Sequence, residues 1–174
     1  MKLKSTHLFW ATALLLLHVS SCGVYREPAS ANDYAARYSI IAIREMKKHK
    51  IPASITLGQG ILESGSGKSY LARTANNHFG IKCTTDWKGA RAYKDAEIPN
   101  ECFRKYKNVA DSYRDHSLFL ANRSRYAMLF QLNIRDYKGW AKGLQSCGYA
   151  TDPAYATKLI RVIEEYKLYL YDKK

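Results

Sequence analysis

The sequence lacks the residue spacings that mark common metal and nucleotide sites. It contains no Cys-x-x-Cys pair and no His-Glu-x-x-His motif, so we expect no zinc site of the usual kinds. The Gly-Ser-Gly-Lys-Ser run at 65–69 is not a phosphate-binding loop, because Leu62 stands where that pattern needs its first glycine. A helical pattern rather than a buried strand precedes the run, which also argues against nucleotide binding.

Long hydrophobic segments are missing too, and acidic residues are few. The apolar run at 8–17 is too short to span a bilayer stably, but after Lys2 and Lys4 it fits a secretory signal. The chain has 15 acidic residues against 28 lysines and arginines. This excess indicates an anionic partner, and for an exported protein an anionic glycan, peptidoglycan or a membrane surface fits better than nucleic acid. A solvated basic surface without a specific ligand is the alternative.

The end of the N-terminal segment resembles a bacterial lipoprotein signal. One aliphatic and two small residues at 19–21 precede Cys22, which would take the lipid and become the new N-terminus. An ordinary secretory signal cut nearby is the alternative. We therefore predict a lipoprotein signal peptide at 1–21, a lipidated N-terminus and tether at 22–32, and one folded domain at 33–174.

Helical periodicity covers most of this domain. Asn32-Asp33 and Asp152 are expected helix caps, and Pro52 and Pro153 are expected first-turn residues. The predicted helices are 33–50, 52–64, 112–121, 125–132, 136–147 and 152–170, with a loop and a short helix at 66–82. The predicted class is α+β and mostly helical.

One segment breaks the helical pattern and reads as a small hairpin. Its candidate strands are 90–93 and 102–106. Cys83 and Cys102 flank this excursion, and we expect them to form a disulfide in an oxidising cell envelope. Cys147, directly before a helix-ending glycine, is left over and is expected to be a buried thiol.

Glu63 is the carboxylate that the sequence isolates most clearly. It closes the apolar stretch 55–62, and residues 54–82 contain no other acid. A helix C-terminus and apolar neighbours both raise the pKa of a carboxyl group, which suits a proton donor near neutral pH. A solvated glutamate in the last turn of a helix is the alternative.

A series of motifs downstream favours the proton donor. They are Asn-Asn-His-Phe-Gly-Ile-Lys at 76–82, Trp-Lys-Gly at 87–89, Cys-Phe-Arg-Lys-Tyr at 102–106, Ser-Tyr-Arg-Asp-His at 112–116 and Gly-Tyr-Ala-Thr-Asp-Pro at 148–153. In this order and spacing they resemble the bacterial endo-β-N-acetylglucosaminidases of glycoside hydrolase family 73, which include cell-wall autolysins and the flagellar-rod peptidoglycan hydrolase domain. The resemblance runs from about Asp33 to Tyr169.

The resemblance implies a lysozyme-like fold with a small β-hairpin lobe. It also implies cleavage of the β-1,4 bond between N-acetylglucosamine and N-acetylmuramic acid, with Glu63 as general acid and Tyr149 lining the cleft near the reacting sugar. The resemblance also places Ser66 among the substrate-binding residues, at a position where related enzymes commonly carry an aromatic residue that stacks on the sugar. Acid-base cleavage of a glycoside needs no metal and no organic cofactor, and we expect neither.

The family's second carboxylate lies on the hairpin and is thought to activate water. This hairpin offers Asp95, Glu97 and Glu101. We favour Glu97, with Asp95 close behind, whereas Glu101 adjoins Cys102 and is expected to be fixed structurally. An inverting enzyme needs its carboxyl groups about 6.5–9.5 Å apart to admit water. A substrate-assisted route through the sugar's acetamido group is the alternative.

Other residues are candidates for contact with the glycan. Asn77, Phe79 and Trp87 belong to this group. Asn77 could equally satisfy loop backbone, and Phe79 could equally belong to the core. His78 and His116 are expected to be polar loop or helix-cap residues.

These observations together predict a monomeric endo-β-N-acetylglucosaminidase of the bacterial cell envelope. Its partners would be peptidoglycan glycan strands and, through the N-terminal lipid, a membrane, but not nucleic acid. A lytic transglycosylase, which shares the fold and also relies on one glutamate, is the alternative among enzymes. A non-catalytic peptidoglycan-binding lipoprotein is the alternative outside enzymes.

Overall fold

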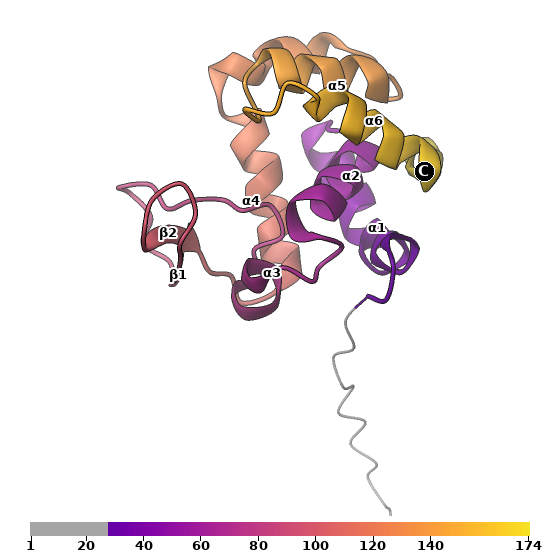
Figure 1. Cartoon of the computed structure of the whole chain (residues 1–174). Coiled ribbons are helices and arrows are strands. Elements are labelled where there is room, and N and C mark those ends of the chain that lie inside the picture. Colours follow the sequence, from indigo (N-terminus) through magenta and orange to yellow (C-terminus); the bar gives the residue numbers. More distant parts are fainter. Residues whose placement is uncertain (1–27) are drawn as a thin grey trace, which may run out of the picture.

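The computed structural model describes residues 28–174, so the predicted signal peptide and Cys22 lie outside the described residues. The elements are α1 (Ala31–His49), α2 (Ala53–Ser64), α3 (Tyr70–Ala75), β1 (Arg91–Lys94), β2 (Glu101–Arg104), α4 (Val109–Ala121), the 3-10 helix η1 (Ser124–Gln131), α5 (Tyr137–Ser146), α6 (Tyr155–Glu165) and the 3-10 helix η2 (Leu168–Lys173). Figure 1 shows a helical body with a small hairpin projecting beside α4. The predicted class, α+β and mostly helical, is confirmed.

The core is built around α2, which packs against α1, α5, α6 and η2 (Figure 1). Every residue from Ala53 to Ile61 is buried. Two glycines make this packing possible, because a Cβ at Gly58 would lie 2.8 Å from Leu159 and one at Gly60 would collide with the Tyr34 hydroxyl. The sequence stretch that looked like an apolar helix is therefore the central element of the fold.

The ends of α2 are fixed by residues far apart in the chain. Pro52 is the N-cap rather than the predicted first-turn residue, and it offers no side-chain cap. The cap comes instead from Asp172 in η2, whose carboxylate accepts hydrogen bonds from the Ser54 N–H (2.8 Å) and hydroxyl (2.6 Å). At the other end Gly65 adopts the left-handed conformation with φ 57°, which stops the helix directly after Glu63 and Ser64.

The hairpin is a two-stranded antiparallel sheet with Arg91 opposite Arg104 and Lys94 opposite Glu101. The predicted strands are present, each within two residues of its predicted ends. Cys83 and Cys102, the pair expected from the sequence, are joined by a disulfide. Phe103 is the buried residue of the two strands, so the hairpin contributes little to the core.

Several helix boundaries differ from the prediction. Ser30, not Asn32-Asp33, caps α1, and Asp33 returns the hydrogen bond as the third residue of a capping box. The predicted helix at 125–132 is a 3-10 helix, η1. Asp152 does not cap α6 directly, because it accepts from the Ala154 N–H in a turn that precedes the helix.

The last predicted helix, 152–170, is divided in two. The first part, α6, ends at Glu165. The second part, η2, follows Lys167, which adopts a left-handed conformation with φ 51°. Cys147 is a free thiol, as predicted, but it is half-buried rather than buried. No helix among residues 28–174 has the length and apolar character needed to cross a membrane.

Candidate active site

Glu63 lies in the last turn of α2 and opens into a cleft of about 480 Å³. The cleft lies between the helical body and the loop that leads into the hairpin. Its walls are Phe79, Gly80, Ile81, Lys82, Cys83, Thr84, Glu97, Phe119, Arg123, Arg125, Tyr149, Ala150 and Thr151. The cleft therefore joins residues from four separate parts of the chain around one carboxyl group.

The surroundings of Glu63 favour its protonated form. Its side chain is open to solvent along the cleft, yet protein surrounds it closely enough that burial raises its pKa from 4.5 to about 7. Within residues 28–174 no side chain or backbone group donates a hydrogen bond to this carboxyl group. The C-terminal end of α2 acts in the same direction, since it disfavours a negative charge. A bound glycan would displace the remaining solvent, so the upward shift would persist in a complex.

Tyr149 lines the cleft beside Glu63, and the buried Tyr155 packs against Tyr149. Tyr149 is half-buried and its ring lies 5.4 Å from that of Tyr155, centroid to centroid. Burial raises the pKa of both tyrosines, and the nearby Glu63 carboxyl raises them further. The Gln59 side-chain amide donates to the Tyr155 hydroxyl at 2.9 Å and fixes it. Both tyrosines are therefore neutral phenols, and Tyr149 is the one that faces the cleft.

A buried hydrogen-bond network lies beneath the Glu63 turn. The Tyr34 hydroxyl lies 2.9 Å from His78 Nδ1 and accepts a hydrogen bond from the Tyr113 hydroxyl at 2.9 Å. His78 is fully buried, and burial lowers its pKa to about 4, so it is neutral. His78 lies in the loop after α3, as predicted, and is buried there. In the turn itself, Ser64 Oγ accepts from the Gly67 N–H at 2.7 Å.

The three acids of the hairpin segment have different surroundings. Glu97 lines the cleft, is 77% exposed, and makes an ion pair with Lys82 at 2.7 Å. Glu101 is mostly buried and pairs with the same lysine at 2.8 Å. Asp95 accepts from the Asn100 N–H at 2.7 Å and is not among the residues that line the cleft. Of the three, only Glu97 faces the same cleft as Glu63.

Of the predicted glycan-contact residues, some line the cleft and others are buried away from it. Phe79 lines the cleft, although it is only 5% exposed and stacks on His116 at 4.1 Å between ring centroids. Asn77 is buried and bonds the backbone of Ile81 and Arg104, so its assignment to substrate is wrong and its alternative as a loop brace is correct. His116 is fully buried inside α4, which contradicts its assignment as a loop or cap residue.

Two further residues predicted to contact substrate do not reach the cleft. Trp87 lines a separate hollow with Tyr106, and the Arg104 guanidinium lies 4.5 Å from the centroid of its ring. Ser66 is half-buried in the turn after α2, with φ 59°, and is not a lining residue. A glycan contact made by Trp87 or Ser66 would therefore lie outside the Glu63 cleft.

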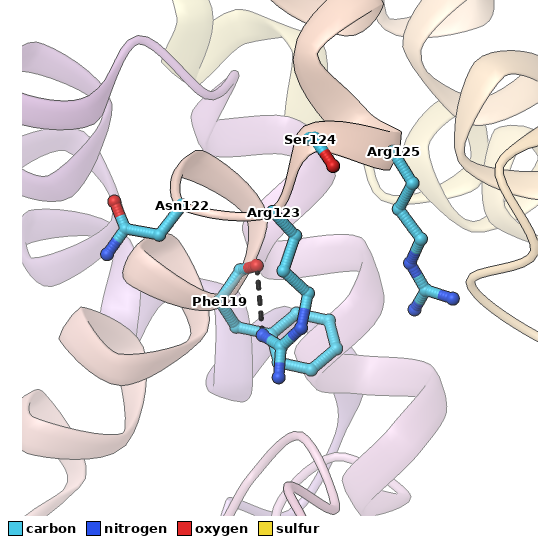
Figure 2. Close-up of a pocket in the computed structure, with 5 residues that line it drawn as sticks. All are labelled: Phe119, Asn122, Arg123, Ser124 and Arg125. Carbon is cyan, nitrogen blue, oxygen red and sulfur yellow. Dashed lines mark hydrogen bonds between the residues drawn. The ribbon is translucent and has the colours of Figure 1, made fainter.

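Sequence reasoning missed the wall formed by the end of α4 and the start of η1. Phe119, Arg123 and Arg125 line the cleft there, and Figure 2 shows them in the adjoining hollow. No motif marked these residues, because Arg123 and Arg125 occur in a polar connection between two helical patterns. Alternation of basic residues in a loop is common on a basic surface, so only the three-dimensional arrangement distinguishes them. No group of three or more metal-ligating side chains occurs within residues 28–174.

Comparison with known proteins places the chain in a family. The family model described as mannosyl-glycoprotein endo-beta-N-acetylglucosaminidase matches residues 39–168. The exo-glucosaminidase LytG of Bacillus subtilis is 39% identical over 73% of this chain and 48% of its own length. The peptidoglycan hydrolase FlgJ of Salmonella typhimurium is 32% identical over 79% of this chain and 46% of its own length. The chain thus spans about half the length of the curated relatives that it matches.

Solved structures agree with this placement. The glycoside hydrolase domain of FlgJ from Salmonella typhimurium superposes with a TM-score of 0.68 at 31% identity, covering 79% of this chain and 89% of that one. A peptidoglycan hydrolase from Sphingomonas sp. A1 gives 0.70 at 29% identity, covering 82% of this chain and 95% of that one. The predicted lysozyme-like fold is confirmed. The chain belongs to the glucosaminidase family of glycoside hydrolases.

Proposed function

We propose that this chain hydrolyses the β-1,4 bond between N-acetylglucosamine and N-acetylmuramic acid in peptidoglycan, with Glu63 as the general acid. The observation that carries the proposal is a carboxyl group with a pKa near 7 that opens into a cleft on a glucosaminidase scaffold. A protonated carboxyl group at this position can deliver its proton to the leaving oxygen without a metal or an organic cofactor.

The proposed reaction uses the two acids that face the cleft. Glu63 donates its proton to the glycosidic oxygen while the bond from that oxygen to the anomeric carbon breaks. A water molecule adds to the anomeric carbon from the other side, and Glu97 accepts the proton that the water loses. Tyr149 packs beside the reacting sugar. In the substrate-assisted alternative, the acetamido oxygen of the sugar attacks the anomeric carbon first, and Glu97 is not needed for that step.

Mass analysis of digested peptidoglycan tests the reaction type. We expect fragments that end in reducing N-acetylglucosamine. Fragments that end in 1,6-anhydro-N-acetylmuramic acid would show a lytic transglycosylase instead, and binding without any cleavage would show a glycan-binding protein. One relative carries an exo-glucosaminidase name. The length of the earliest products therefore also decides between internal cleavage, which we propose, and release from chain ends.

We also propose that Cys22 carries a lipid and holds the enzyme on a membrane of the cell envelope. The support is the sequence pattern around Cys22 and the family's action on the cell wall. Growth of a producing bacterium with a labelled fatty acid should label the parent chain, and Cys22→Ala should abolish the label. Labelling that persists in Cys22→Ala would contradict the anchor while leaving the hydrolase proposal intact.

A further inference from the structure

Two arginines occupy the wall of the cleft at the connection between α4 and η1. Arg123 and Arg125 flank Ser124 at the start of η1, and both line the Glu63 cleft and the shallow hollow next to it. Figure 2 shows both guanidinium groups extending from the same side of the chain, whereas Asn122 points away from them. Two planar cations therefore lie along one edge of the space that Glu63 faces.

Aromatic contacts hold these guanidinium groups in place. That of Arg123 lies 3.6 Å from the centroid of the Phe119 ring, and it donates to the Phe119 carbonyl at 3.1 Å (Figure 2). That of Arg125 lies 4.6 Å from the centroid of the Tyr126 ring and donates to the Tyr126 hydroxyl. Stacking of this kind leaves the outer edge of a guanidinium fork free to bind an anion while restricting its motion.

The charge of these two arginines is not neutralised by the protein. Within residues 28–174, no carboxylate makes an ion pair with either arginine. The nearby Asp115 is already taken by Arg104 at 3.0 Å. Across the cleft the situation is the reverse, because two carboxylates, Glu97 and Glu101, surround the single cation Lys82. The cleft, as the described residues form it, therefore carries two unpaired cations on the arginine side, whereas the charged lining residues opposite, Lys82 and Glu97, form an ion pair.

We propose that Arg123 and Arg125 form a subsite for a carboxylate carried by the glycan substrate. The inference rests on the proposed function and adds a specificity element to the same cleft. A guanidinium fork matches a carboxylate with two parallel hydrogen bonds, and lysine would match it less well. Two parts of peptidoglycan carry such a group, the lactyl side chain of muramic acid when no peptide is attached and the peptide when it is. The subsite orients the glycan by its acidic side chain so that the neighbouring glycosidic oxygen faces Glu63.

Binding measurements on the full chain carrying Glu63→Gln test the subsite without turnover. Calorimetry compares three ligands, which are a neutral N-acetylglucosamine tetramer, a peptide-free glycan with a lactyl carboxylate, and a peptide-bearing glycan. An amidated form of each acidic ligand is the matched ligand control. Adding R123Q and R125Q should lower the affinity for at least one acidic ligand roughly tenfold or more, as expected for loss of hydrogen bonds to a charged group. The affinities for the neutral and amidated ligands should stay within about twofold.

Further variants separate charge, geometry and folding. R123K with R125K keeps the charge but loses the fork, so it should restore only part of the affinity. R125Q alone leaves the Phe119–Arg123 stack intact and should still weaken the acidic ligand, which keeps the test valid if the double variant folds poorly. R161Q, on an exposed face of α6 that borders a different hollow, is the control and should change nothing.

The acidic ligand whose affinity falls in the arginine variants shows whether the bound carboxylate is that of the lactyl group or that of the peptide. The proposal is overturned if the arginine substitutions lower the affinities for acidic and neutral ligands equally, or if they lower neither. It is also overturned if no ligand binds the Glu63→Gln chain. Its failure is distinct from failure of the proposed function, which is measured by cleavage with the parent chain. If the parent chain cleaves peptidoglycan but binding does not depend on the arginines, the subsite proposal is ruled out and the hydrolase proposal stands. If binding depends on the arginines but the parent chain does not cleave, the hydrolase proposal is ruled out and the subsite proposal stands.

Discussion

The two sides of the cleft are held in different ways. Glu63 ends a helix that is buried from Ala53 to Ile61 and fixed at its start by Asp172. Glu97 belongs to the hairpin segment, in which Phe103 is the buried strand residue, and its own partner is Lys82. The proposed proton donor is thus positioned by the whole fold, whereas the proposed base is positioned by a disulfide and one ion pair.

This difference separates two kinds of consequence. Changes beneath α2 should alter stability, because they disturb the core that the helix completes. Changes on the hairpin should alter the reaction rate while the fold survives, because few core contacts depend on the hairpin. The following predictions are ordered from the largest expected effect to the smallest, and each tests one side of this comparison.

The largest effect should follow Glu63→Gln. We expect hydrolysis of peptidoglycan to fall by roughly 10³-fold, since the variant cannot donate a proton to the leaving group. Steady-state release of reducing ends measures this loss. Glu165→Gln, an exposed glutamate on α6, is the matched control and should retain the parent rate. Cleavage by Glu63→Gln at the parent rate would remove Glu63 from the mechanism.

The same variant should not be less stable than the parent in mild base. The folded pKa of Glu63, about 7, exceeds the unfolded value of 4.5, so its protonated form favours folding below pH 4.5. That contribution is lost as the pH rises through 7. Thermal melting at pH 8 should therefore give Glu63→Gln a melting temperature equal to or above that of the parent. A clear drop would mean that Glu63 braces the fold.

A smaller loss should follow Glu97→Gln on the hairpin side. We expect about a 10²-fold decrease in kcat with an unchanged melting temperature, because the variant removes a base but no core contact. Asp95→Asn is the matched control, since Asp95 accepts a backbone hydrogen bond in the hairpin turn and does not face the cleft. If Asp95→Asn loses more activity than Glu97→Gln, the assignment of the base is reversed. Equal activity of both with the parent would favour the substrate-assisted route.

The pH profile should show a more gradual effect. Glu63 must be protonated to act, and its pKa is about 7. The value of kcat/KM should therefore fall about tenfold per pH unit above pH 7. A rate that stays constant from pH 6 to pH 9 would contradict a carboxylic acid donor with this pKa.

The smallest effect on rate, but a clear one on stability, should follow Asp172→Ala. It leaves the start of α2 without its cap, so we expect a loss of about 1–3 kcal/mol in the free energy of unfolding. Urea unfolding measures it. Asp136→Ala removes the exposed cap of α5 and should cost only about 1 kcal/mol. If the two losses are equal, the buried cap of α2 has no special part in holding the helix.

The sequence predicted the features that local patterns determine. Periodicity located most helices, the break in periodicity located the hairpin, and its two flanking cysteines are the disulfide pair. The structure also confirms that Glu63 closes an apolar helix. These features depend on neighbours in the chain, so a single sequence contains enough information to find them.

Features set by distant parts of the chain were missed. His78 and His116 are polar residue types, but Tyr34, Tyr113 and Phe79 surround them in the core. Asn77 is conspicuous in its motif, yet it braces a loop instead of facing the substrate. Contacts over such separations depend on how the helices pack, and no local pattern encodes that.

The capping of α2 and the arginine wall were missed for the same reason. Asp172 reaches Ser54 across 118 positions of the chain, and Arg123 faces Glu63 only because α4 delivers it there. Neither relation leaves a periodic signal in the sequence. The sequence could therefore single out Glu63 as the candidate proton donor but not the residues that hold and surround it.

Titration of the Glu63 carboxyl group tests the central claim most directly. The side-chain carboxyl carbons of the glutamates can be labelled with ¹³C and followed by NMR from pH 3 to pH 9, and Glu63→Gln identifies the resonance of Glu63 by its loss. We predict a midpoint near pH 7, because burial at the end of α2 disfavours the charged form. A midpoint near the ordinary value of 4.5 would show an ionised glutamate at neutral pH and would contradict its role as the proton donor.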